Sequence, residues 1–163
     1  MAKMSAYIDV ANLLHGGNAV NIRIDYAKFK PILVGTRAPV DLNFYDCTQN
    51  LPKQNQFFDR MRDLGYNVKL TRIHSYNGAQ LEEKKIDTRI VADSIVDGLV
   101  EKKIDTAVFC SGDKDLKPAI DYLMQAGIQV EIASFEHCLA WELRLCGAKI
   151  INLTTIAPLI RKI

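Results

Sequence analysis

Short apolar runs alternate with longer amphipathic ones along the whole chain. The short runs are rich in β-branched and aromatic residues, as in TAVFC at 106–110, and are typical of strands. The longer runs space their apolar positions three or four residues apart, which is typical of helices packed against a sheet. The predicted strands are 6–10, 40–47, 66–73, 106–110, 129–135 and 149–153. The predicted helices are 26–33, 52–64, 81–100, 118–126 and 136–146.

This order of elements predicts an α/β fold with a parallel or mostly parallel sheet covered by helices. The run 106–110 is nearly all apolar, so we expect a central strand buried on both faces, whereas 66–73 alternates and suits an edge strand. Residues 11–21, ANLLHGGNAVN, are expected to form a loop. There is no internal repeat and no linker, so residues 1–163 are expected to form a single domain.

Composition narrows the classes of function only a little. The chain is 48% hydrophobic and 25% charged with a net charge of +2, which excludes a disordered chain and permits nucleic-acid binding without arguing for it. The cysteines at 47, 110, 138 and 146 form no CxxC pair, which argues against a disulfide framework and a zinc site. We expect no secretory signal, no membrane span and a cytoplasmic location.

Acidic residues follow two of the predicted strands. Asp9 ends the first strand with Asn12 three residues later, and the central strand runs into Ser111, Asp113 and Asp115. In an open α/β sheet the ligand site lies outside the carboxyl ends of the strands. Each motif also suits an ordinary turn or helix cap, but one cap needs a single such residue. The surplus in SGDKD therefore favours a functional site there.

A third acidic group lies in the predicted helix 81–100. Asp87 and Asp93 are separated by six residues, about 240° of turn, so they lie on different faces of that helix. Asp93 is near the apolar side, where a half-buried carboxylate needs a partner. The four charged residues at 82–85 are interpreted as a solvated first turn.

Converging carboxylates would need a cation or bound protons. Two unit charges about 4 Å apart repel by about 4 kcal/mol at an effective dielectric near 20. Oxygen ligands suit Mg²⁺ or Mn²⁺, whereas His15, His74 and His137 are too scattered for zinc. A hard cation among carboxylates typically serves phosphate chemistry. A haloacid-dehalogenase-type phosphatase would need an acid at Ala11, and no Walker A loop is present.

With these motifs in this order, the chain resembles a NYN domain, of the LabA-like branch of the PIN-like nuclease superfamily. The family opens with a strand ending in Asp followed by Asn-Leu, as at Asp9, Asn12 and Leu13. Its middle helix carries lysines, an apolar residue and two Asp, and its fourth strand ends in Ser-Gly-Asp-x-Asp. The matching residues are Lys84, Lys85, Ile86, Asp87, Asp93, Ser111, Gly112, Asp113 and Asp115. The family usually has Phe next, and this chain has Leu116.

The resemblance implies a PIN-like three-layer sandwich with a central, mostly parallel sheet of five or six strands, and a metal-dependent endoribonuclease. The implied catalytic and Mg²⁺- or Mn²⁺-binding residues are Asp9, Asp87, Asp113 and Asp115. Residues implied to support them are Asn12, Asp93 and Ser111. Residues implied to contact RNA phosphates are Lys84, Lys85, Arg89, Lys114 and Lys117, although each also suits a solvated charged face. The expected partner is single-stranded RNA, and no association with a membrane is expected. Self-association into a homo-oligomer is left open.

Two other functions remain open at this level. One is a non-catalytic regulator that keeps the site and binds RNA or nucleotide, and the other is a phosphoesterase acting on small molecules. All the matched acids are present, which favours the nuclease. An RNA site is expected to be an open groove with basic walls, whereas a small-molecule site is expected to be a closed pocket.

Overall fold

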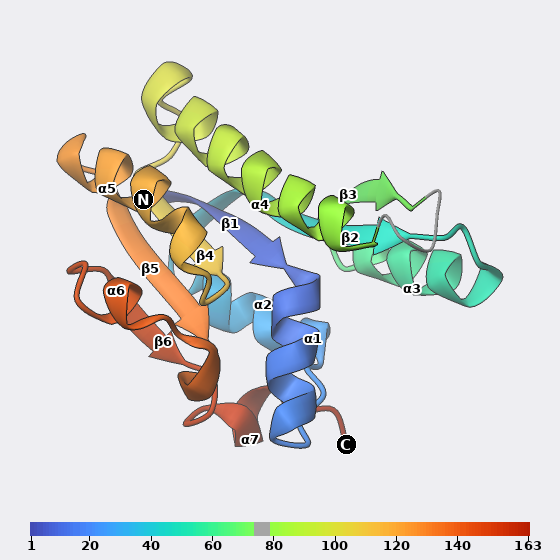
Figure 1. The fold of residues 1–163 in the computed structure, drawn as a ribbon. Coiled ribbons are helices and arrows are strands. Elements are labelled where there is room, and N and C mark those ends of the chain that lie inside the picture. Colours follow the sequence, from blue (N-terminus) through green and yellow to red (C-terminus); the bar gives the residue numbers. More distant parts are fainter. Residues whose placement is uncertain (74–78) are drawn as a thin grey trace.

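Six parallel strands form one sheet at the centre of the molecule (Figure 1). The computed structural model describes residues 1–73 and 79–163, the side chains of 79–84 excepted. The strands are β1 (Lys3–Asp9), β2 (Ala38–Thr48), β3 (Asn67–Arg72), β4 (Thr106–Cys110), β5 (Gln129–Ser134) and β6 (Lys149–Asn152). Their order across the sheet is β3-β2-β1-β4-β5-β6. The expected α/β fold with five or six strands is confirmed, and β3 is an edge strand as predicted.

Helices cover both faces of the sheet, which gives three layers. They are α1 (Val10–Ala19), α2 (Tyr26–Val34), α3 (Pro52–Asp63), α4 (Ala79–Ile95), α5 (Lys117–Gln125), α6 (Trp141–Arg144) and α7 (Ala157–Ile160). A π-helical turn, Val96–Val100, extends α4. Apolar side chains of α1, α2, α3 and α7 pack on one face, and those of α4, α5 and α6 on the other. Figure 1 shows α4 and α5 side by side on that second face.

The central strands supply apolar side chains to both layers in turn. In β1, Ile8 packs toward α1 and α2, while Tyr7 packs toward α4. In β4, Val108 and Phe109 divide in the same way, which explains why this strand is almost entirely apolar. The winding of the chain changes sides between β1 and β4, so their carboxyl ends form the switch point at which open α/β sheets bind ligands.

The prediction of a loop over residues 11–21 is wrong, because most of this segment forms α1. Asp9 caps the helix, and Leu13 is buried beneath it. Gly16 and Gly17 lie within the helix. A Cβ on Gly16 would lie 2.8 Å from the Phe135 ring, and one on Gly17 would lie 2.3 Å from the carbonyl oxygen of a neighbouring residue. The two glycines therefore permit close packing rather than a turn.

The predicted helix 136–146 is also wrong as a single element. A short 3₁₀ turn, Glu136–Cys138, is followed by extended backbone at Leu139, and α6 begins only at Trp141. The break lets the N–H of Ala140 donate a 3.0 Å hydrogen bond to the carbonyl oxygen of Gly112. This bond holds α6 against the loop after β4. No helix among the described residues combines the length and apolar character needed to cross a membrane.

Candidate functional site: an acid cluster at the switch point

The ends of β1 and β4 are tied together by backbone and amide hydrogen bonds. Asp9 accepts a 3.1 Å hydrogen bond from the backbone N–H of Asn12 as the N-cap of α1. The side-chain oxygen of Asn12 accepts a 3.3 Å hydrogen bond from the N–H of Gly112. A Cβ on Gly112 would lie 2.2 Å from the Cys138 carbonyl oxygen, so this tight approach requires glycine. Asn12 thus positions the loop after β4 against the start of α1.

That loop is a compact turn which directs two carboxylates to the same place. The hydroxyl of the buried Ser111 accepts a 3.3 Å hydrogen bond from the N–H of Asp113. Asp113 in turn accepts a 2.9 Å hydrogen bond from the N–H of Asp115, at the start of the 3₁₀ turn Lys114–Leu116. Asp113 is half-buried and Asp115 is exposed, so the pair runs from the interior to the surface.

Asp87 of α4 completes the arrangement. One carboxylate oxygen from each of Asp87, Asp113 and Asp115 lies within 4.8 Å of the other two. Oδ1 of Asp87 is fully buried and accepts no hydrogen bond in the described part of the chain. Burial, followed by the negative charges of Asp9 and Asp113, raises the pKa of Asp87 to about 8. We call Asp9, Asp87, Asp113 and Asp115 the acid cluster.

The acid cluster has the chemistry of a divalent-cation site. Carboxylates this close repel one another, so the metal-free protein must hold a proton among them, and the raised pKa of Asp87 favours that residue as its place. A buried carboxylate oxygen without a hydrogen bond is costly unless something else occupies it. An oxygen-only donor set suits Mg²⁺ or Mn²⁺, so the residues present fit such an ion.

Asp46 is a further carboxylate near the cluster that the sequence analysis missed. It lies near the carboxyl end of β2, next to Tyr45, the register partner of Asp9. Burial raises its pKa to about 6, and the charge of Asp9 adds to this increase. The 2.8 Å hydrogen bond from the N–H of Cys47 lowers the pKa but does not outweigh burial. Its position at a strand end, the same signal that singled out Asp9, could have identified it.

The structure places Asp93 in a different environment from the acid cluster. It accepts a 2.7 Å hydrogen bond from the Tyr45 hydroxyl and forms a 2.9 Å ion pair with Lys69. Burial alone would raise the pKa of Asp93, but these bonds outweigh it and hold the pKa below its ordinary value. Six residues along α4 correspond to about 9 Å, so Asp93 ties α4 to β2 and β3 and is not among the carboxylates that meet at Asp87.

The basic residues on α4 divide between packing and exposure. Arg89 donates a 3.2 Å hydrogen bond to the Thr71 hydroxyl and lies 5.9 Å from the centre of the Tyr45 ring. Its guanidinium is therefore engaged with β2 and β3. Lys85 is exposed, and the side chain of Lys84 lies outside the described residues.

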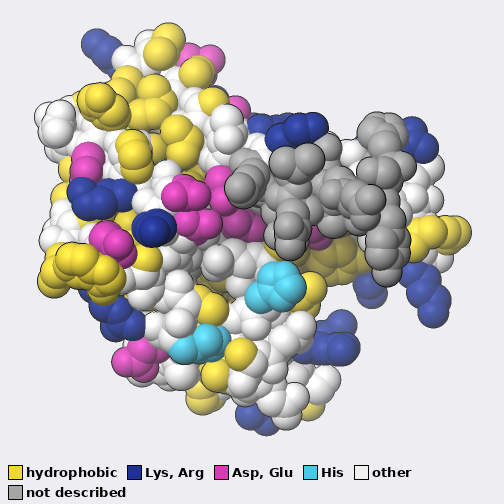
Figure 2. Space-filling model, in the orientation of Figure 1, with side chains coloured by type: hydrophobic (Ala, Val, Ile, Leu, Met, Phe, Trp, Pro, Cys, Tyr) yellow, Lys and Arg dark blue, Asp and Glu magenta, His cyan; other side chains and the backbone are white. Residues whose placement is uncertain are grey.

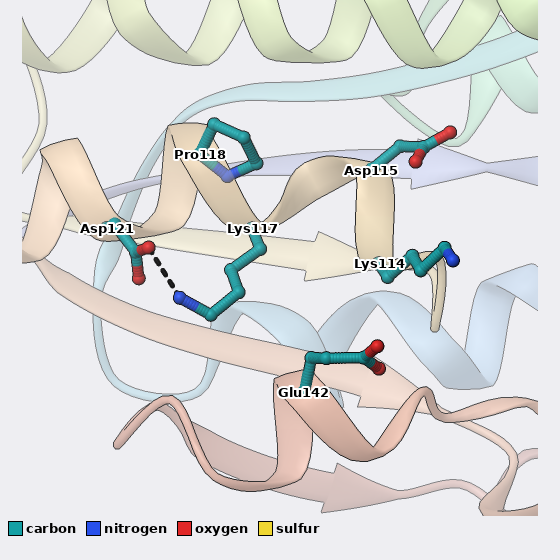
Figure 3. A pocket seen from close by; sticks show the side chains of 6 residues that line it. All are labelled: Lys114, Asp115, Lys117, Pro118, Asp121 and Glu142. Carbon is teal, nitrogen blue, oxygen red and sulfur yellow. Dashed lines mark hydrogen bonds and ion pairs between the residues drawn. The ribbon is translucent and has the colours of Figure 1, made fainter.

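A depression of about 610 Å³ adjoins the acid cluster between α5 and α6. Its lining residues are Lys114, Asp115, Lys117, Pro118, Asp121 and Glu142. Lys117 and Asp121 form a 2.6 Å ion pair at one end of the depression. Asp115 lies at the other end, and its side chain points away from Glu142 (Figure 3). Lys114 is exposed. Figure 2 shows the acidic side chains gathered at the centre of this face, with lysine and arginine side chains beside them.

Comparison with known proteins gives a family and a fold. The family model described as "NYN domain" matches residues 3–154. A crystal structure of a protein of unknown function from Vibrio parahaemolyticus RIMD 2210633 is similar to this chain, with a TM-score of 0.80 and 23% sequence identity. The match covers 93% of each chain. No curated protein matches the sequence.

Proposed function

The chain belongs to the NYN domain family, and from this membership and the acid cluster we propose that it is a metal-dependent endoribonuclease. The proposed substrate is single-stranded RNA, the proposed cofactor is Mg²⁺ or Mn²⁺, and the proposed location is the cytoplasm. We further propose that the chain belongs to the LabA-like branch of the family. One observation carries the proposal: a buried oxygen of Asp87 without a hydrogen bond, on a carboxylate that meets those of Asp113 and Asp115.

Each residue of the site has a separate role in this proposal. Asp87, Asp113 and Asp115 would hold the cation, with Asp9 beside Asp87. The cation, when bound, would activate a water molecule and stabilise the negative charge that develops on the phosphate. Asp87 would lose its proton on cation binding, because burial and then the charges of Asp9 and Asp113 raise its pKa to about 8, and a bound cation would favour the ionised form. Asn12 keeps the loop that carries Asp113 in register with Asp9.

The surroundings of the acid cluster favour a polymer over a small phosphoester. Asp115 is exposed and belongs both to the cluster and to the lining of the depression between α5 and α6, so the site continues along the surface. Lys114 is exposed there, where it could contact a phosphate. Trp141 follows Ala140, whose N–H is hydrogen-bonded to Gly112 of the loop after β4. The Trp141 side chain is 66% exposed, so a base could stack on it.

The proposal is tested with purified protein and a single-stranded RNA labelled at one end. With Mn²⁺ or Mg²⁺ we expect internal cuts, and with EDTA none. Asp113→Asn should reduce the cleavage rate by at least about a hundredfold, since even residues behind a metal ligand are worth 10- to 100-fold. Asparagine is also a good cap, so this variant should keep the fold. Asp63→Asn, at an exposed position on α3, is the control with the same change in charge.

Cleavage by Asp113→Asn at the rate of the parent protein would show that the activity belongs to a contaminant. Binding of RNA without cleavage under any metal condition would support the non-catalytic alternative. Trp141 is the only tryptophan of the chain, so its fluorescence reports RNA binding in the same samples. For Lys114→Ala, a phosphate contact predicts that the slope of log affinity against log salt falls by about 0.7.

A further inference from the structure

A second cavity lies on the other side of Asp9, among α1, α2, α3 and the end of β2. It encloses about 270 Å³, and we call it the α1–α3 pocket. Val10, which follows Asp9 in the chain, and Asp46, near the end of the neighbouring strand, both line it. The pocket is therefore adjacent to the acid cluster, on the side opposite the depression between α5 and α6.

The walls of the α1–α3 pocket are largely apolar and partly aromatic. Leu14 and Ile22 form one part of the lining, and Tyr26 and Phe57 another. The rings of Tyr26 and Phe57 are 6.4 Å apart and inclined at 66°. The side chain of Leu14 is 54% exposed although it lies at the pocket, which leaves apolar surface for a ligand to cover. The volume is just below the usual range of about 300–1,000 Å³ for drug-sized ligands, so it suits one planar ring system.

Three charged side chains line the same pocket. Asp46 is the carboxylate, and its Oδ1 already accepts the N–H of Cys47. Arg23 and Lys162 are exposed cations. Their backbones are adjacent, because the N–H of Lys162 donates a 2.8 Å hydrogen bond to the carbonyl oxygen of Arg23. The lining charge is thus positive at the exposed cations and negative at Asp46. A complementary ligand would be a planar apolar group that carries hydrogen-bond donors for Asp46 and an attached anion for Arg23 and Lys162.

We propose that the α1–α3 pocket binds one nucleobase of the RNA strand held at the acid cluster, with Asp46 accepting hydrogen bonds from the base and Arg23 and Lys162 contacting an adjoining phosphate. The inference rests on the proposed function, because it assigns the pocket to the same substrate. Proteins that read single-stranded RNA typically hold an unstacked base by its Watson–Crick edge against aromatic and apolar side chains.

The carboxylate determines which base the pocket prefers. A carboxylate only accepts hydrogen bonds. Guanine offers two neighbouring donors on its Watson–Crick edge, the ring N–H and the amino group. Adenine and cytosine offer one amino group beside an acceptor, and uracil offers one N–H between two carbonyl oxygens that a carboxylate would repel. We therefore expect guanine to bind best and uracil worst.

The first test measures binding of the four nucleoside monophosphates by calorimetry in EDTA. GMP should bind at least about tenfold more tightly than UMP, the discrimination of one good bidentate contact. Asp46→Asn replaces one acceptor by a donor and should bring the ratio of GMP to UMP affinity close to one. Leu14→Trp should fill the pocket and weaken all four ligands, and its exposed position makes the substitution compatible with folding. Asp63→Asn is again the charge-matched control.

The second test separates this proposal from the nuclease itself. Cut sites in a mixed-sequence RNA are mapped for the parent protein and for Asp46→Asn, and the readout is the distribution of sites rather than the rate. Cuts at a fixed distance from guanines that lose this preference in the variant would support the pocket. A guanine-selective pocket in a protein that cuts no RNA would overturn the nuclease and keep the pocket. Equal affinity for the four nucleotides, or no binding at millimolar concentration, would overturn the pocket even if RNA is cut.

Discussion

Replacing Asp87 by asparagine should stabilise the metal-free protein at alkaline pH. Asp87 is the member of the acid cluster whose buried oxygen accepts no hydrogen bond within the described chain. Asp9 and Asp113 also cap helical turns, so substitutions there would mix a change in the strength of a cap with relief of repulsion. Asparagine at 87 removes the charge while it keeps the size of the side chain.

The magnitude follows from the raised pKa. The pKa of Asp87 is about 8 in the folded protein, whereas in the unfolded chain it takes its ordinary value near 3.8. Between pH 3.8 and pH 8, the folded state therefore keeps a proton that the unfolded state has lost. Stability contributed by this group is complete below pH 3.8 and falls as the pH rises toward 8, by at most about 1.4 kcal/mol per unit. From pH 6 to pH 8 the upper limit is about 2.7 kcal/mol. Since Asp87 is only partly buried, solvent screening should reduce this to about 1–1.5 kcal/mol.

The assay is urea unfolding in EDTA, followed by far-UV circular dichroism because the single tryptophan is exposed. The upper half of the titration of Asp46, whose pKa is about 6, also falls between pH 6 and pH 8, but it contributes equally to all three proteins. The parent protein and the Asp63→Asn control should therefore lose clearly more stability across this window than Asp87→Asn. If the variant shows the same slope as the parent, or is less stable than it at pH 8, Asp87 does not hold the proton of the cluster.

Three further outcomes are expected. Mg²⁺ at about 100 times its Kd should raise the free energy of unfolding by about 2.7 kcal/mol. At a fixed Mg²⁺ concentration this increase should be larger at pH 8 than at pH 6, because Asp87 must first lose its proton. Equal increases at the two pH values would contradict this expectation. Gly17→Ala would gain up to about 1 kcal/mol in an open helix, but its Cβ would meet the Ile22 carbonyl oxygen, so urea unfolding should show a loss of about 1–3 kcal/mol. Tyr7→Phe removes a 2.6 Å hydrogen bond to the buried Asp97 and should cost about 1–3 kcal/mol, so an unchanged urea midpoint would show that this hydrogen bond does not stabilise the fold.

Most of the fold could be predicted because its periodicities are local. The apolar strands and the amphipathic helices each carry their own pattern, and parallel pairing follows from their alternation. The errors occurred where distant contacts decide. The pair Gly16 and Gly17 resembles a turn, yet the packing of Phe135 and Ile22 against α1 is what requires glycine. The break before α6 exists because Ala140 donates to Gly112, a contact across many residues of chain.

The candidate site was predictable to a similar extent. The topology rule places Asp9 and Asp113 at one edge of the sheet, and the structure brings Asp87 to them from α4. The family resemblance implies a supporting role for Asp93, and its position near the apolar side of the helix predicts a partner, but the sequence does not show that the partners are Tyr45 and Lys69. The position of a side chain around a helix is predictable, whereas its partner on a neighbouring strand depends on register.

The acid cluster also shows why capping and function were hard to separate by sequence. Asp9 caps α1 and Asp113 caps the turn after β4, so the ordinary interpretation of each residue is correct. A cap explains neither the convergence of the two segments nor a third carboxylate between them. Asp87 lies within a helix, receives no hydrogen bond at its buried oxygen in the described chain, and is destabilised by its acidic neighbours. Since an isosteric asparagine would relieve this cost, the presence of aspartate at position 87 is better explained by a ligand than by folding, whichever cation and substrate the experiments identify.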